Sequence, residues 1–284
     1  MNKSFYNSEC CLNNYIDTIS KRGILPLLKV ENCNLKIYDS VDSTNNVAKE
    51  MVALNAEHGT VILANVQTGG RGRYGRSFFS PLGHGIYMTF ILRPYPIWPV
   101  DISLVTVFTG VVVCEAIESI CNVSSTTKKI PQIKWVNDVF LDRKKIGGIL
   151  TEAVTDESGT LQWIVVGIGI NFTATTDLPV ELEGIVGSIF DFDKENLLIT
   201  RNQLAAEIIN RMLNPTYTSK EIIEGYRQRL FILGKKVRVE GTENPYEATV
   251  LDIDDMGKLL VKNESGDVIT LSAGEVSIRS FVGS

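Results

Sequence analysis

The run Gly69-Gly-Arg-Gly-Arg-Tyr-Gly-Arg76 joins two β-rich stretches, Thr60–Gln67 and Gly85–Leu92. Glycine permits backbone conformations that other residues avoid, and it lets a backbone come close to a ligand. The arginines present planar donors that match phosphate and carboxylate oxygens. They are Arg71, Arg73 and Arg76. The run indicates a loop between strands that wraps around an anion such as a nucleotide phosphate. Taken alone, it is equally compatible with a solvated basic loop.

The composition is that of an ordinary globular protein. Of 284 residues, 44% are hydrophobic and 21% are charged, which predicts one large domain with a small one, or two domains. The net charge of −5 and a pI near 5.3 argue against a general nucleic-acid binder, which must neutralise many phosphates. The basic loop is therefore a local exception, as expected for one small anionic ligand.

Cysteine and histidine offer little material for catalysis or for a metal site. The five cysteines show no Cys-x-x-Cys spacing, so neither a disulfide framework nor a zinc site is expected. Cys114 and Cys121 fall in an apolar stretch and are predicted to be core residues. The two histidines are His58 and His84, and we interpret His84 as a loop residue.

No targeting segment or membrane span is expected. Residues 1–35 form a polar, weakly helical leader without the apolar core of a signal peptide. The most apolar stretch, Leu104–Ile117, is short for a bilayer and contains Glu115. These features predict a cytoplasmic protein.

Periodicity predicts alternating strands and helices up to about residue 231. Asp42-Ser43-Thr44-Asn45 is a cluster of helix-capping side chains before a short helix over 47–54, and Asp101 is expected to cap a buried helix that extends to about Ile120. Short strands should follow at Gln132–Val136, Val139–Asp142, Lys145–Val154 and Leu161–Phe172, and helices at Arg201–Leu213 and Ser219–Phe231.

The pattern changes from Gly234 onward. Short alternating strands separated by glycine and asparagine turns indicate a small appended β-barrel. They are Lys236–Glu240, Tyr246–Ile253, Lys258–Lys262 and Val268–Leu271.

Polar groups and glycines stand at strand ends and inside apolar strands. Ser43, Thr44 and Asn45 together exceed what one helix cap needs, so spare groups could hold a neutral polar ligand. Gln67 ends a strand beside the loop, and Lys134 adds a point charge suited to a phosphate. The ordinary interpretations are a cap, an edge residue and a surface lysine. Glycines inside apolar strands mark either close approach to a ligand or tight strand packing. They occur in Gly147-Gly148 and Gly167-Ile-Gly169.

Taken in order, the motifs resemble those of biotin–protein ligases over roughly residues 36 to 282. They are Asp42-Ser-Thr-Asn45, Gln67 with Gly70-Arg-Gly-Arg-Tyr-Gly-Arg76, Lys134-Trp-Val-Asn-Asp138, Lys145-Ile-Gly-Gly-Ile-Leu150 and Gly167-Ile-Gly-Ile-Asn171. The resemblance implies an α+β fold. A mixed-sheet, class II synthetase-like catalytic domain over 36–232 follows the leader 1–35 and precedes an SH3-like barrel over 233–284.

The resemblance also implies the chemistry. The enzyme would join biotin to ATP, in the presence of Mg²⁺, as biotinyl-5′-AMP. It would then transfer biotin to a lysine of a biotin carboxyl carrier protein. No prosthetic group and no metal site of the protein itself are implied. Fixed cations suit such chemistry, because charge develops on the phosphorus.

The resemblance assigns roles residue by residue. The catalytic residues would be Lys134 and Arg73. The biotin contacts would be Ser43, Thr44, Asn45, Gln67, Arg71, Gly72, Arg73 and Lys134. The nucleotide contacts would be Arg71, Arg73, Arg76, Phe78, Lys134 and Asn171, with Phe78 stacking on adenine and Asn171 on the ATP and Mg²⁺ side. Glu275 and Arg279 in the barrel would support nucleotide binding.

The sequence departs from the family pattern at two places. Val136 stands where the motif usually has proline. The front of the chain is too short and insufficiently basic for the winged helix of bifunctional members, so we expect a ligase without a DNA partner, monomeric or homodimeric. The alternatives are a lipoate–protein ligase-like enzyme and a non-catalytic biotin sensor or repressor.

Overall fold

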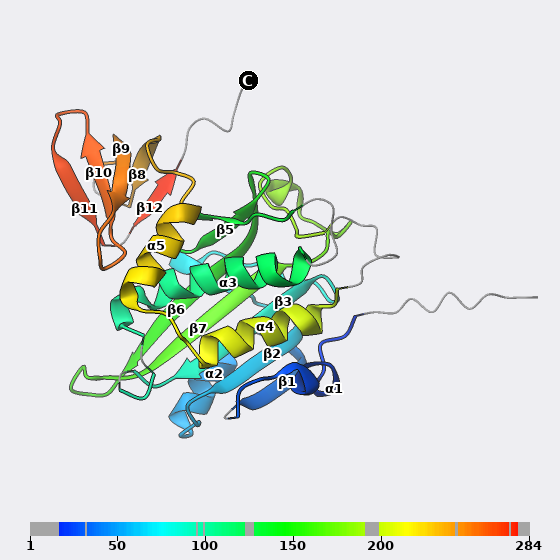
Figure 1. Cartoon of the computed structure of the whole chain (residues 1–284). Coiled ribbons are helices and arrows are strands. Elements are labelled where there is room, and N and C mark those ends of the chain that lie inside the picture. Colours follow the sequence, from blue (N-terminus) through cyan, green and yellow to red (C-terminus); the bar gives the residue numbers. More distant parts are fainter. Residues whose placement is uncertain are drawn as a thin grey trace, which may run out of the picture.

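The computed structural model describes residues 17–31, 33–94, 96–98, 100–122, 128–190, 199–241, 244–272 and 274–277. A seven-stranded mixed sheet forms the larger part (Figure 1). Its order is β1 (Asn34–Val41), β2 (Thr60–Gln67), β3 (Gly85–Leu92), β7 (Leu161–Asn171), β6 (Lys144–Thr155), β5 (Asp138–Leu141) and β4 (Gln132–Lys134). Only β1 and β2 pair in parallel, and the other neighbouring strands are antiparallel. The expected mixed sheet is confirmed.

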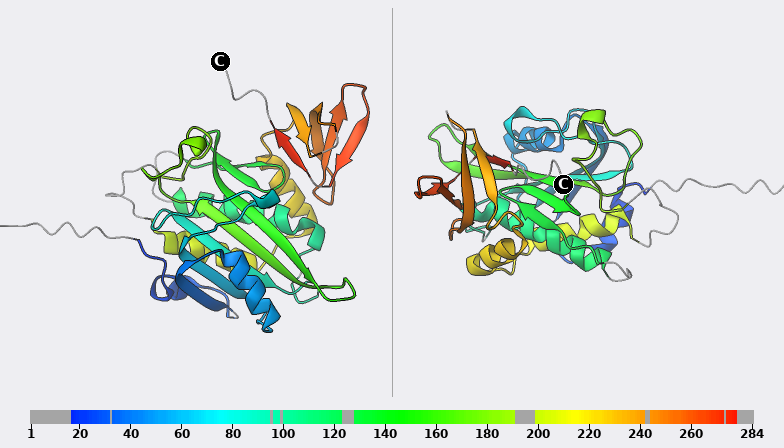
Figure 2. Two further views of the ribbon diagram at one scale, coloured as in Figure 1. Left: turned by 180° about the vertical axis from the view of Figure 1, so that it is seen from behind. Right: turned by 90° about the horizontal axis from the view of Figure 1, so that it is seen from above.

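Helices cover both faces of this sheet. The helices α3 (Val105–Cys121), α4 (Arg201–Leu213) and α5 (Ser219–Arg229) lie on one face, and α2 (Thr44–Ala53) lies on the other (Figure 2). Capping boxes begin α4 and α5, because Thr200 and Thr218 exchange hydrogen bonds with residues three positions later.

The strand β7 shows how the sheet separates its two faces. Ile164, Val166, Ile168 and Ile170 belong to the main hydrophobic core. Val165 belongs instead to a smaller cluster with Ala48 and Val52 of α2. Successive side chains of a strand alternate between faces, so a strand buried on both sides is apolar throughout. On the α2 side, the apolar residues give way to Gly167 and Gly169.

The helix α3 starts later than the sequence suggested and ends within about one residue of the expected end. Asp101 caps a three-residue 3-10 turn, Ile102–Leu104, by accepting from the Ser103 amide, and α3 begins only at Val105. By length and composition alone, the continuous helical segment Ile102–Cys121 could cross a membrane. It extends beyond the stretch Leu104–Ile117, which was judged too short. Its most apolar window is 72% buried within the protein, as in a core helix.

The two glutamates of α3 form ion pairs. Glu115 and Glu118 lie 2.8 Å from guanidinium nitrogens of Arg211 and Arg229, respectively. Cys114 and Cys121 are buried, as predicted. These ion pairs tie α3 to α4 and α5 on the helical face.

A separate five-stranded antiparallel sheet follows. Its order is β11 (Val268–Leu271), β10 (Leu259–Asn263), β9 (Tyr246–Ile253), β8 (Lys236–Glu240) and β12 (Glu275–Ser277). The four predicted strands are confirmed, with β10 starting and ending one residue later than expected. Trp135 Nε1 donates to the Gly257 carbonyl (2.9 Å), which attaches this module to the larger sheet. Glu275 begins β12, and Arg279 lies outside the described residues.

The front of the described chain contributes to the core. Ile19 and Ile24 are buried, and α1 (Lys21–Ile24) packs beside α4. A 3-10 turn, Leu25–Leu27, follows α1. The strand β1 was not predicted, because its polar residues do not form a clear alternating pattern. The boundaries of the leader and of the two domains stay predictions.

Candidate active site

A cavity of about 870 Å³ lies on the α2 side of the sheet. The residues of the larger domain that were predicted to bind biotin or nucleotide line it. They are Ser43, Thr44, Asn45, Gln67, Arg71, Gly72, Arg73, Arg76, Phe78, Lys134 and Asn171. Arg73 and Lys134 therefore share one cavity, although they are 61 positions apart in the chain. The roles assigned to single residues stay predictions.

The two glycines of β7 leave space that other side chains fill. A Cβ atom on Gly167 would lie 2.1 Å from Asn45 Oδ1, and one on Gly169 would lie 2.7 Å from the Phe78 ring. Both distances are far below van der Waals contact. The glycines thus let α2 and the loop press side chains against the strand backbone, as expected for close approach.

A buried hydrogen-bond network forms the wall near α2. The Thr44 amide and hydroxyl donate to Gln67 Oε1 (2.9 and 3.0 Å), and Gln67 Nε2 donates to Ser80 Oγ (2.9 Å). The Thr89 hydroxyl donates to Asn45 Oδ1 (2.7 Å) and lies 2.8 Å from Thr44 Oγ1. Thr44 and Asn45 are each 4% exposed, so this wall is rigidly held.

Helix capping does not explain this cluster. Ser43 is the N-cap residue of α2, but among the described residues its side chain makes no capping hydrogen bond. Asp42 instead accepts from the Ser43 amide and from Asn46 Nδ2. The Ser43 side chain lies in the cavity lining, and Thr44 and Asn45 are already inside the helix.

Glu152 of β6 contacts three side chains, and two of them, Asn45 and Arg71, line the cavity. Its carboxylate accepts from Asn45 Nδ2 (2.9 Å) and Lys49 Nζ (3.1 Å), and it lies 3.5 Å from Arg71 Nη1. Burial opposes ionisation of Glu152. The hydrogen bonds from Asn45 and Lys49 and the charges of Lys49 and Arg71 outweigh it, so its pKa lies below the ordinary value.

The glycine-arginine loop forms a compact turn. The Gly72 amide donates to the Arg76 carbonyl (2.7 Å), and the Phe78 amide donates to the Gly70 carbonyl (2.8 Å). Tyr74 has a positive φ of 55°, an uncommon conformation outside glycine, and it is 64% exposed. Arg73–Gly75 forms a short 3-10 turn. Arg73 Nη1 donates to the Gly274 carbonyl of the C-terminal module (3.3 Å).

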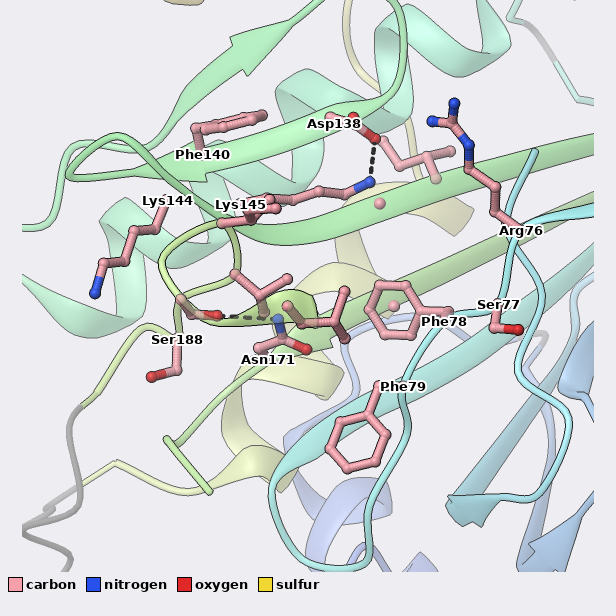
Figure 3. A pocket seen from close by; sticks show the side chains of 18 of the residues that line it. Arg76, Ser77, Phe78, Phe79, Asp138, Phe140, Lys144, Lys145, Asn171 and Ser188 are labelled. Atoms are coloured by element: carbon pink, nitrogen blue, oxygen red, sulfur yellow. Dashed lines mark hydrogen bonds and ion pairs between the residues drawn. The ribbon is translucent and has the colours of Figure 1, made fainter. Parts of the chain in front are cut away.

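Lys145 and Asp138 were not among the predicted site residues. Lys145 Nζ lies 2.7 Å from Asp138 Oδ1, and both residues line the cavity (Figure 3). Lys144 points the other way from the same strand (Figure 3). In the run Lys145-Ile-Gly-Gly148, the glycines were considered in the sequence analysis. The charge of the preceding lysine, next to glycines that could approach a ligand, was the feature that could have indicated a site residue.

Asn171 and Phe78 both line the cavity, and the Phe78 ring packs over Gly169, two residues before Asn171 (Figure 3). Asn171 Nδ2 donates to the Gly187 carbonyl (2.9 Å), which fixes the amide with its oxygen turned away from that carbonyl. His84 lines the cavity from the loop before β3, with Nδ1 3.3 Å from the Thr173 hydroxyl. Val276 of β12 also lines the cavity, so the C-terminal module reaches the site.

Comparison with known proteins decides the family. Residues 37–171 match the model of the biotin/lipoate A/B protein ligase family, and residues 232–279 match that of the biotin protein ligase C-terminal domain. The bifunctional ligase/repressor BirA of Bacillus spizizenii is 32% identical over 240 residues, which cover 80% of this chain and 69% of that protein. The chain belongs to the biotin protein ligase family. Like its relatives, it is a ligase.

A solved structure and a further sequence relative agree with this assignment. The biotin protein ligase of Aquifex aeolicus in complex with biotin and ATP superposes on this protein with a TM-score of 0.68 at 27% identity. The superposition covers 86% of the present chain and 97% of the Aquifex chain. The biotin–[acetyl-CoA-carboxylase] ligase of Mycobacterium tuberculosis is 26% identical over 253 residues, 85% of this ligase and 88% of that protein. The predicted family and fold class are therefore confirmed.

Proposed function

We propose that this ligase activates biotin with ATP and transfers it to a carrier protein. In the first step a biotin carboxylate oxygen attacks the α-phosphorus of ATP, the bond to pyrophosphate breaks, and biotinyl-5′-AMP forms. In the second, the ε-amine of a lysine on a biotin carboxyl carrier protein attacks the acyl carbon, loses a proton and releases AMP. The observation that carries this proposal is the cavity in which the motif residues meet.

The two sides of the cavity suit the two ends of biotin. Hydroxyl and amide groups of Ser43, Thr44, Asn45 and Gln67 offer donors and acceptors for a neutral ureido group. Cations on the loop and at the strand ends suit the carboxylate and the phosphates. Such fixed charges stabilise the charge that develops on phosphorus, and neither step needs a nucleophile from the protein.

The cations divide into loop and strand groups. We assign the loop arginines Arg71 and Arg73 to the biotin carboxylate and α-phosphate, and Arg76 to the nucleotide. Lys134 keeps its predicted role as a phosphate cation. We add Lys145 on β6, because it lines the cavity and its ammonium lies next to Asp138. Phe78 is assigned to the adenine ring and Asn171 to the ATP and Mg²⁺ side.

Mg²⁺ would arrive as part of the substrate. Among the residues that the structure describes, no cluster of three or more histidine, cysteine, aspartate or glutamate side chains is present. Mg²⁺ in nucleotide sites is commonly held by phosphates and water with few protein oxygens. The Asn171 amide oxygen fits such a limited donor set.

A mass measurement tests the proposal. The ligase is incubated with biotin, MgATP and a biotin carboxyl carrier domain. We expect the carrier to gain the mass of one biotinyl group, and a carrier whose acceptor lysine is changed to arginine to gain none. The same incubation with lipoate, read by pyrophosphate release, separates a lipoate ligase. A sensor would bind biotin and release no pyrophosphate.

Two further predictions concern partners. We predict that the protein is a monomer or a homodimer. We also predict that it does not bind DNA specifically. A gel-shift assay at physiological salt examines the second, and tight sequence-specific binding would contradict it.

A further inference from the structure

Glu152 occupies a position that no motif identified. It lies on β6, opposite Val165 of β7, and its side chain is 22% exposed. Its carboxylate touches side chains of three other residues: Asn45 and Lys49 of α2, and Arg71 of the loop. Arg71 Nη1 also donates to Asn46 Oδ1 (2.9 Å). One carboxylate thus connects the rigid wall with the glycine-arginine loop.

We propose that Glu152 is a positioning residue that couples the biotin wall to the closed position of the loop. This inference rests on the proposed function for its catalytic consequence. The carboxylate would fix the amide orientation of Asn45 and, through its charge, hold Arg71 against α2. Lys49 would keep the carboxylate ionised and in place.

The contacts separate two actions of Glu152. An acceptor oxygen suffices for the hydrogen bond from Asn45 Nδ2, which a neutral amide also supplies. Attraction of Arg71 and Lys49 needs the negative charge. Asn45 Nδ2 has a second acceptor, the Leu150 carbonyl at 3.3 Å, so removal of Glu152 weakens the orientation of this amide without leaving it unpaired.

Two substitutions at this position resolve the two actions. In Glu152→Gln an oxygen remains for Asn45 and the charge is lost. We expect the Kd for biotin to change by less than about twofold, and loop cleavage by an arginine-specific protease to rise roughly threefold, as for loss of a partly exposed ion pair. In Glu152→Leu both actions are lost, and we expect the Kd for biotin to rise by about tenfold as well.

The experiment uses the full chain, with Glu157→Gln as the matched control. Glu157 is an exposed carboxylate in the turn after the same strand. Biotin binding is measured by calorimetry, pyrophosphate release gives KM and kcat, and melting temperature monitors the fold. The expected pattern is a lower kcat with an unchanged biotin KM for Glu152→Gln, and effects on both for Glu152→Leu.

Several outcomes overturn the coupling. They are equal loop cleavage in Glu152→Gln and Glu157→Gln, equal biotin affinity in Glu152→Gln and Glu152→Leu, or losses in Glu152→Leu that merely follow a lower melting temperature. Failure of the proposed function gives a different result, namely no biotin binding by the unsubstituted chain. Cleavage of the ligand-free variants then still tests whether the charge of Glu152 holds the loop.

Discussion

The α2 wall and the glycine-arginine loop face the same cavity and are built in opposite ways. In the wall, Thr44, Asn45 and Thr89 are at most 4% exposed and exchange hydrogen bonds among themselves. In the loop, Tyr74 is 64% exposed, Arg71 contacts Glu152 and Asn46, and Arg73 donates to the Gly274 carbonyl. A preformed wall favours selection of a neutral group, whereas a loop with few contacts can open and close.

The largest expected effect concerns the strand cations, which belong to neither region. Lys145→Ala removes an ammonium from the cavity and leaves Asp138 without this partner, so its charge would face the phosphates. We expect adenylation to fall on the order of 10²–10³-fold, and on the order of 10²-fold for Lys134→Ala. Pyrophosphate release measures both.

Lys236→Ala is the control for charge loss, since Lys236 is an exposed residue of β8 outside the cavity lining. Unchanged turnover in Lys145→Ala would remove this lysine from the mechanism. A deeper loss in Lys134→Ala than in Lys145→Ala would make Lys134 the more important phosphate cation.

The second prediction breaks the rigid wall. Gly167→Ala places a methyl group where Asn45 Oδ1 now lies, so Asn45 must move. We expect a loss of about 2 kcal/mol in stability and about 30-fold in biotin affinity. Urea unfolding and calorimetry measure the two quantities.

A double variant serves as the control for this clash. Asn45→Ala combined with Gly167→Ala removes the obstructing amide, so stability should recover while biotin affinity stays low. If the single variant kept full affinity, the wall would not need to be rigid.

The third prediction probes the wall without touching the cavity. Thr89→Val keeps the side-chain volume but removes the hydroxyl that supports Thr44 and Asn45. We expect biotin affinity to fall about fivefold, the equivalent of about 1 kcal/mol. Thr60→Val is the matched control, because Thr60 is equally buried. Its hydroxyl donates to the Glu57 carbonyl just before the start of β2, whereas Gln67 of the wall lies at the end of this strand. Equal affinities in the two variants would contradict a preorganised wall.

The smallest effect is expected in the loop. Biotin with MgATP should slow cleavage by an arginine-specific protease within residues 69–80 by roughly threefold, because ligand phosphates would add contacts to a weakly held segment. Cleavage in the C-terminal module serves as the internal reference. Equal loop cleavage with and without ligands would show that the loop is as fixed as the wall.

The sequence predicted the elements whose local signals agree with the fold. The strands Thr60–Gln67 and Gly85–Leu92 and the helix Arg201–Leu213 have the predicted bounds. Their burial on one or both faces imposes a clear apolar pattern. The strand Asn34–Val41 was not predicted, because it lies at the edge of the sheet and has several polar side chains. The helix that ends at Cys121 has nearly the expected end, but a 3-10 turn separates its start from the predicted cap Asp101.

The candidate site divides in a similar way. Motif residues such as Gln67, Arg73 and Asn171 could be chosen from sequence because they stand at strand ends or between glycines. Lys145 and Glu152 were not chosen, since a charged residue in a strand usually faces solvent. Their importance depends on which partners the sheet register brings to them, namely Asp138 for the one, and Asn45 and Arg71 for the other.

The bare backbone of β7 at Gly167 and Gly169 has an evolutionary consequence. At these two positions the sheet supplies the cavity floor without side chains of its own, so the chemical character of the chamber depends on residues from α2, the loop and the neighbouring strands. Selectivity for a different small acid could therefore arise by substitutions in α2, the loop and the neighbouring strands, while β7 and the hydrophobic layer behind it stay the same.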